Sequence, residues 1–210
     1  MRFRRILTVL TLVVLAASTL TACETKVGQA ADVGGATLSD STLAEYVQPG
    51  AVPYTDQSGE KVVPKLNALT TWVRNELLKA TIAAHGGPVT TDELNAAHNV
   101  IVDAGVPDQA AKANRGNGYA SGFFDMLTEQ YTLLTVLVER LAKTSDAAKA
   151  FNLLQSGQAN QAFSAAIVAA KTPVEISPRY GTWDASRLSV SSFANDPHAG
   201  APEFVHFAKS

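Results

Sequence analysis

Apolar residues recur three or four positions apart through most of the chain between residues 64 and 171, which is the spacing of one face of an α-helix. The first long helix is expected to begin at Pro64, and Gly86-Gly87-Pro88 is expected to stop it. Further helices are expected over residues 90–104, 119–143, 145–156 and 158–171, with a short one near residues 39–47. We therefore expect a body of about five helices, with the strongly apolar 119–143 segment at its centre.

Short strands are expected on both sides of this helical region. Residues 30–37 are typical of a strand that ends in a turn at Gly34-Gly35, and Val174–Ser177 alternates as a strand does. A single strand leaves backbone N–H and C=O groups without partners, so we expect these two segments to pair. The predicted fold class is mainly α, with a small two-stranded sheet that joins the N- and C-terminal segments.

Residues 48–63 are expected to form a loop, and residues 109–118 are small and polar.

Side chains suited to helix capping stand before three of the expected helices. Ser39 is expected to cap the short N-terminal helix, and Ser145-Asp146 precedes the helix that carries Phe151. Thr90 followed by Glu93 has the spacing of a capping box, in which each residue bonds the backbone of the other.

The first 22 residues have the composition of a secretory signal rather than of a folded segment. Arg2, Arg4 and Arg5 form a basic start, and a short apolar run from Ile6 to Ala17 follows them. A helix that spans a bilayer needs about 20 apolar residues, so this run is too short to do so comfortably. We expect residues 1–22 to be removed on export.

The segment Leu20-Thr21-Ala22-Cys23 resembles a bacterial lipobox and ends on the only cysteine of the chain. The resemblance implies that Cys23 receives a diacylglyceryl thioether and becomes the mature N-terminus. Two acyl chains are needed because a single chain gives only marginal, reversible membrane binding. The protein is then expected on the extracytoplasmic face of the cell membrane, with the lipid bilayer as a partner through acylated Cys23. The alternative is an ordinary secreted protein with an incidental free thiol.

The charge of the chain argues against nucleic acid as a partner. The full chain has 17 basic and 19 acidic residues, a formal net charge of −2. The signal contains three arginines and no acidic residue, so the mature chain has 14 basic and 19 acidic residues, a net charge of −5. Nucleic-acid-binding domains usually carry a basic excess. Residues 23–30 are small and polar and are expected to form a tether between the lipid and the domain.

The sequence contains no arrangement of residues that is typical of a catalytic or metal site. It has no G-x-S-x-G elbow, no P-loop and no H-E-x-x-H motif. One cysteine excludes an intramolecular disulfide framework and a multi-Cys zinc site. His85 and His98 could in principle ligate one metal, but exposed or capping roles explain them more simply. We therefore expect a protein that is not an enzyme and holds no cofactor or metal.

Two segments of the mature chain resemble a known family. Residues 31–40, Ala-Asp-Val-Gly-Gly-Ala-Thr-Leu-Ser-Asp, resemble the V-x-G-x-x-I-S opening of the SurA and PrsA chaperone domains. Residues 174–184 are similar to the V-x-V-x-P-R-(F/Y)-G-x-W ending of SurA-N-like lipoproteins, on the residues Pro178, Arg179, Tyr180, Gly181 and Trp183. The resemblance covers residues 31–184 and implies a strand–helices–strand chaperone domain. A simpler interpretation of Pro178–Gly181 is a turn that packs Tyr180 and Trp183 on the helical body. The two interpretations are compatible.

The chain departs from SurA and PrsA in one respect. Those proteins also carry a parvulin isomerase domain of roughly a hundred residues, whereas only 26 residues follow Asp184 here. The resemblance thus implies the chaperone module without the catalytic one, and residues 185–210 are expected to form a flexible tail.

The expected function is a membrane-anchored module that binds non-native or exported polypeptides. Aromatic side chains on the helices are the candidates for an apolar client groove: Trp72, Phe123, Phe124 and Tyr131. Two alternatives stay open, a lipoprotein that binds lipid or a small solute in an enclosed apolar pocket, and a peptidoglycan or isomerase enzyme. An open groove would favour polypeptide binding, and a closed cavity within the usual range of about 300–1,000 Å³ would favour a small ligand.

Overall fold

The computed structural model describes residues 28–191 and confirms a mainly α fold with a small sheet. Seven helices occur in this part of the chain: one at each of the six expected segments, and α5 in addition. Their bounds are α2 Asp40–Glu45, α3 Pro64–Ala84, α4 Thr91–Asp103, α5 Val106–Ala113, α6 Ser121–Ala142, α7 Ala147–Gln155 and α8 Asn160–Ala170. None of the helices in residues 28–191 is long and apolar enough to cross a membrane.

The N- and C-terminal segments pair in one sheet, as predicted. Strand β1 (Gln29–Val33) lies antiparallel to β5 (Val174–Ile176), with Ala31 opposite Ile176 and Val33 opposite Val174. The sheet has three strands rather than the expected two, because β2 (Ala36–Ser39) pairs with the other edge of β1.

The third strand forms because the turn at Gly34-Gly35 reverses the chain tightly. Both glycines have positive φ, at 59° and 93°, a region that residues with a side chain rarely adopt. The N–H of Gly35 donates to the Asp32 carboxylate at 3.0 Å. The strand order is therefore β2-β1-β5, with the buried side chains of Ala31 and Val33 in its middle.

Two short hairpins lie outside this sheet, and both correct an expectation. Within the expected loop 48–63, β3 (Tyr54–Thr55) pairs with β4 (Lys61–Val62). Residues 185–191, expected to belong to the flexible tail, complete a hairpin in which β6 (Thr182–Asp184) pairs with β7 (Ser189–Ser191).

The β6–β7 hairpin is ordered because it buries side chains against α3. Leu188 and Val190 are buried, and the N–H of Val190 donates to the Thr70 hydroxyl at 3.2 Å. The buried guanidinium of Arg74 donates to the Leu188 carbonyl at 2.6 Å and to the Arg187 carbonyl at 3.4 Å. Residues 192–210 lie outside the described part of the chain.

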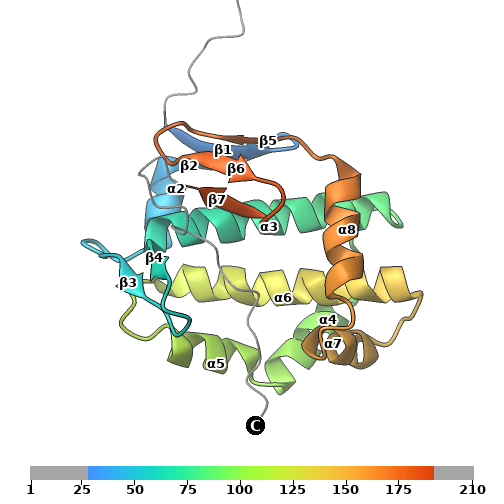
Figure 1. Cartoon of the computed structure of the whole chain (residues 1–210). Helices are drawn as coiled ribbons and strands as arrows, with labels where there is room; N and C mark the ends of the chain where they lie inside the picture. The colour runs from blue at the N-terminus through green and yellow to red at the C-terminus, as the bar shows by residue number, and fades with distance from the viewer. Residues whose placement is uncertain (1–27, 192–210) are drawn as a thin grey trace, which may run out of the picture.

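Helices α3 and α6 form the middle of the molecule and separate the sheet from α7 (Figure 1). Helix α3 packs on β1 and on α6, and α6 packs in turn on α4, α5 and α7. Helix α6 buries side chains along most of its last four turns, which agrees with the central place expected for the 119–143 segment. The core therefore runs between α3 and α6, and the sheet and α7 lie on opposite sides of it.

The predicted caps are present at α2, α4 and α7. The side chains of Ser39 and Asp146 accept from backbone N–H groups, and Thr90 and Glu93 form the reciprocal capping box. Helix α5 was not expected, because Gly105 and Pro107 suggested only the end of α4. Gly105, at φ 69°, ends α4, while Pro107 occupies the first turn of α5, where its missing N–H costs nothing.

Candidate functional site

The predicted lipidation site lies outside the described residues. Cys23, the signal 1–22 and the first residues of the tether precede Gly28, where the described part begins. Lipid anchoring therefore stays a prediction from the sequence.

The two family-like segments meet at the end of the sheet. Arg179 forms an ion pair with Asp40, the first residue of α2, and also donates to the Gln29 carbonyl at 3.0 Å. The Tyr180 hydroxyl donates to the other oxygen of Asp40 at 2.9 Å. The guanidinium of Arg179 and the ammonium of Lys65 each lie 5.2 Å from the centre of the Tyr180 ring. This cluster ties the start of β1, the start of α2 and the turn after β5 together.

The remaining residues of the C-terminal motif form a turn that lies on the body. The Tyr180 N–H donates to the Ser177 carbonyl at 2.9 Å, with Pro178 inside that turn. Gly181 has φ 122°, which a residue with a side chain would rarely adopt. Trp183 stands opposite Val190 in the β6–β7 hairpin, and both Tyr180 and Trp183 pack half-buried against the core. The motif residues thus hold the fold together rather than line an opening.

The candidate groove residues Phe123 and Phe124 belong to an aromatic cluster at the start of α6. Phe123 is 1% exposed and stacks on Tyr119, with ring centres 4.0 Å apart. Phe124 is half-buried and meets the Tyr119 ring edge-on. Tyr119 was not among the candidate groove residues, although the helix expected over residues 119–143 begins with it; it lies two residues before the start of α6 at Ser121.

The hydroxyl of Tyr119 joins this cluster to two distant elements. It accepts from the Asn67 amide at 2.7 Å and shares a hydrogen bond of 3.1 Å with the Tyr54 hydroxyl. Burial raises the pKa of Tyr119 well above its ordinary value. The phenol is therefore neutral, and its role is to hold the β3–β4 hairpin on α3 and α6.

The other two candidate groove residues, Trp72 and Tyr131, pack half-buried against the core from α3 and α6. Burial raises the pKa of Tyr131 to about 12, and the positive charge of Arg74 partly offsets that effect. Burial also lowers the pKa of Arg74 to about 10, which leaves its guanidinium charged at neutral pH. Phe123 has no surface for a client, while Trp72, Phe124 and Tyr131 keep part of theirs.

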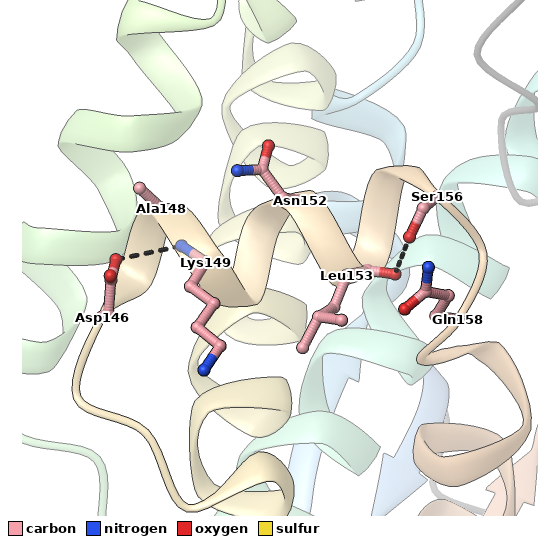
Figure 2. Close-up of a pocket in the computed structure, with 7 residues that line it drawn as sticks. All are labelled: Asp146, Ala148, Lys149, Asn152, Leu153, Ser156 and Gln158. Atoms are coloured by element: carbon pink, nitrogen blue, oxygen red, sulfur yellow. Dashed lines mark hydrogen bonds between the residues drawn. The ribbon is translucent and has the colours of Figure 1, made fainter.

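An open hollow of about 550 Å³ lies elsewhere, on the solvent side of α7 (Figure 2). Two rows of side chains on α7 line it, one with Ala148, Asn152 and Ser156, the other with Asp146, Lys149 and Leu153. Residues three and four positions apart share a helix face, which is why these two rows run side by side. Gln158, in the turn after α7, closes one end. None of the four aromatic candidates lines this hollow.

Some polar side chains of the hollow hydrogen-bond the backbone of α7, and others make no hydrogen bond within the described residues. Asp146 accepts from the backbone N–H of Lys149 at 3.0 Å, and the Ser156 hydroxyl donates to the Leu153 carbonyl at 3.1 Å (Figure 2). Within residues 28–191, the side-chain amides of Asn152 and Gln158 have no hydrogen-bond partner. The hollow therefore offers donors and acceptors to a ligand, with one carboxylate and one ammonium that balance in charge.

The described residues show no arrangement for metal binding. Among residues 28–191, no group of three or more histidine, cysteine or acidic side chains is placed to hold a metal ion. The charged clusters present are ion pairs, such as Arg140 with Glu93 and Lys79 with Glu76 and Glu129.

Comparison with known proteins adds no relative: no family model, no curated protein and no solved structure matches this chain.

Proposed function

We propose that this protein is a lipid-anchored module that holds non-native or exported polypeptide segments outside the cytoplasm. The observation that supports this function best is the open hollow of about 550 Å³ on α7. An open hollow suits a chain segment that enters and leaves from the side, whereas small-molecule pockets usually enclose most of their ligand. Its mixed lining also suits many different sequences, because neither apolar surface nor one sign of charge dominates it.

The position of the hollow fits an anchored protein. Gly28 is the fifth residue after Cys23, the proposed lipid attachment site, and five extended residues span at most about 18 Å. Strand β1 therefore stays near the bilayer, and α7 lies on the opposite side of α3 and α6 (Figure 1). In this orientation the hollow faces away from the membrane, toward polypeptides that have just been exported.

The proposal assigns binding rather than catalysis to this module. The sequence carries no P-loop, so polypeptide would be held and released without ATP. Binding is expected to be weak, because ordering a flexible client consumes part of the gross interaction energy. Weak, reversible binding is what a module that passes on its clients requires.

The test is suppression of aggregation. The full chain, in mild detergent and without nucleotide, is added to a reduced client protein that aggregates, and light scattering is followed. We expect suppression near equimolar ratio, while isomerisation of a proline test peptide stays at its uncatalysed rate of tens to hundreds of seconds. No suppression at tenfold excess would contradict polypeptide holding, and accelerated isomerisation would contradict a purely binding role.

A further inference from the structure

We propose that the hollow on α7 binds the main chain of an extended, uncharged polypeptide segment through the side-chain amides of Asn152 and Gln158. This proposal rests on the proposed function and assigns it a site and a mode of recognition. A peptide unit presents one N–H donor and one C=O acceptor, and a side-chain amide presents the same two kinds of group. Amides of this kind can therefore bind a main chain whatever side chains it carries.

The two amides are available because nothing else in the structure uses them. Asn152 and Gln158 are exposed, and within the described residues neither side chain makes a hydrogen bond. By contrast, Asp146 and Ser156 are engaged with the backbone of α7 itself. The amides are thus the neutral polar groups of the hollow that remain for a ligand.

The shape of the hollow suits a chain segment that lies along the helix. The Asn152 side chain stands between the small residues Ala148 and Ser156 in one row, so its amide is open on both sides along the helix, and Lys149 and Leu153 form the neighbouring row (Figure 2). From Asp146 to Ser156 the helix rises about 15 Å. An extended strand rises about 3.3 Å per residue, so four or five client residues would fill that length.

The remaining lining limits what the segment can carry. Leu153 packs half-buried against the core and offers an apolar contact. Asp146 and Lys149 bring opposite charges, so the hollow has no net attraction for an acidic or a basic client. Uncharged segments with small or aliphatic side chains are the preferred occupants, because they leave the Asp146 carboxylate on the Lys149 N–H and the exposed Lys149 ammonium in water, and so bury neither charge.

The experiment measures binding of a labelled eight-residue peptide of alanine, serine and leucine, with blocked ends, to the full chain in detergent by fluorescence anisotropy. The double variant Asn152→Ala/Gln158→Ala is compared with Asn99→Ala/Gln161→Ala, which removes two exposed helical amides outside the hollow. We expect the first variant to bind at least tenfold more weakly and the second to stay within twofold of the wild type. The same peptide with methylated backbone nitrogens should also bind at least tenfold more weakly.

The outcomes separate this proposal from the proposed function. Unchanged affinity in Asn152→Ala/Gln158→Ala, with aggregation still suppressed, would overturn the site and leave polypeptide holding in place. Equal binding of the methylated peptide would overturn main-chain recognition. A wild-type chain that neither binds peptide nor suppresses aggregation would overturn both.

Discussion

Asp40 and Arg179, which lie 139 residues apart in the sequence, form an ion pair at the end of the three-stranded sheet, where β2 and β5 stop and β1 begins. Arg179 also bonds the Gln29 carbonyl, and Tyr180 bonds the second oxygen of Asp40. Gln29 and Ala30, the last two residues of the expected tether 23–30, belong to β1 instead, and Arg179 joins the start of this strand and the start of α2 to the turn after β5. Side chains therefore reinforce the junction that the pairing of β1 with β5 already makes between the two ends of the domain.

Replacing Asp40 with alanine should lower the free energy of unfolding by about 1.5–2.5 kcal/mol. An exposed ion pair contributes at most about 1 kcal/mol, and a hydrogen bond from a hydroxyl to a carboxylate adds about 1.5 kcal/mol. Urea denaturation measures the change. Asp125→Ala, which removes an exposed carboxylate on α6, is the matched control and should change stability by less than about 0.5 kcal/mol. Equal effects of the two substitutions would show that the junction contributes nothing specific.

Among the charged residues, we expect the replacement of Arg140 to lower the free energy of unfolding the most. Its guanidinium donates to the carbonyls of Ile82, Gly87 and Pro88 and to both oxygens of Glu93, so it fixes the α3–α4 turn on α6. Arg140→Ala leaves these acceptors without their donor, and we expect a loss of about 3 kcal/mol by urea denaturation. A loss below about 1 kcal/mol would contradict this assignment.

The contact between Arg140 and Glu93 makes the free energy of unfolding depend on pH. The hydrogen bond from Arg140, followed by that from the Thr90 backbone, lowers the pKa of Glu93 from its ordinary 4.5 to about 2. Because the folded pKa is the lower one, the stabilisation is complete above about pH 4.5 and is lost as the pH falls toward 2. Glu93→Gln should therefore lose less stability than the wild type between pH 5 and pH 2. Asp92→Asn, an exposed neighbour in the same helical turn, should keep the wild-type slope.

Arg74 should hold the β6–β7 hairpin to the body. Arg74→Met retains much of the buried stem but removes the donors to the Leu188 and Arg187 carbonyls. We expect about 2–3 kcal/mol of destabilisation, with faster hydrogen exchange at Val190 than in the wild type. Arg115→Met, at an exposed arginine, is the control. Unchanged exchange at Val190 would show that the hairpin holds its position without Arg74.

Cys23→Ser should release the protein from the membrane or leave the precursor unprocessed. The hydroxyl of serine is too weak a nucleophile to take up the diacylglyceryl group that the lipobox implies, and stable anchoring needs two acyl chains. Partition into a detergent phase, followed on an immunoblot, measures the outcome. A variant that partitions as the wild type does would contradict lipid anchoring.

The sequence predicted the elements whose signals are local. The caps at Ser39, Thr90 and Asp146 depend on residues three positions away, and the pairing of Val174–Ile176 with β1 follows because each strand needs a partner. The regular spacing of apolar residues also predicted α3 and α6 and the central place of α6 in the core. The caps and the apolar periods need no knowledge of distant contacts, whereas the strand pairing joins distant segments and was predicted only because each lone strand needs a partner.

Apart from this strand pairing, the contacts between distant residues were not predicted. The β6–β7 hairpin lies in a Ser- and Ala-rich segment, and its order depends on Arg74, 114 residues before Leu188. The partner of Arg179 emerges only once β1 and β5 bring Asp40 beside it. The hollow on α7 depends on how small and long side chains alternate on a solvent-facing surface, and an apolar period gives no sign of that.

Site-specific crosslinking tests the central claim, that a client polypeptide lies in the hollow on α7, most directly. A photoreactive phenylalanine analogue replaces Ala148 in the hollow or, as the control, Thr37 on the exposed side of β2, in the full chain incubated with an unfolded client. Mass spectrometry then counts the crosslinked client at each position. We predict client adducts from position 148 and none above background from position 37, whereas equal adducts from both positions, or none from position 148, would contradict the account.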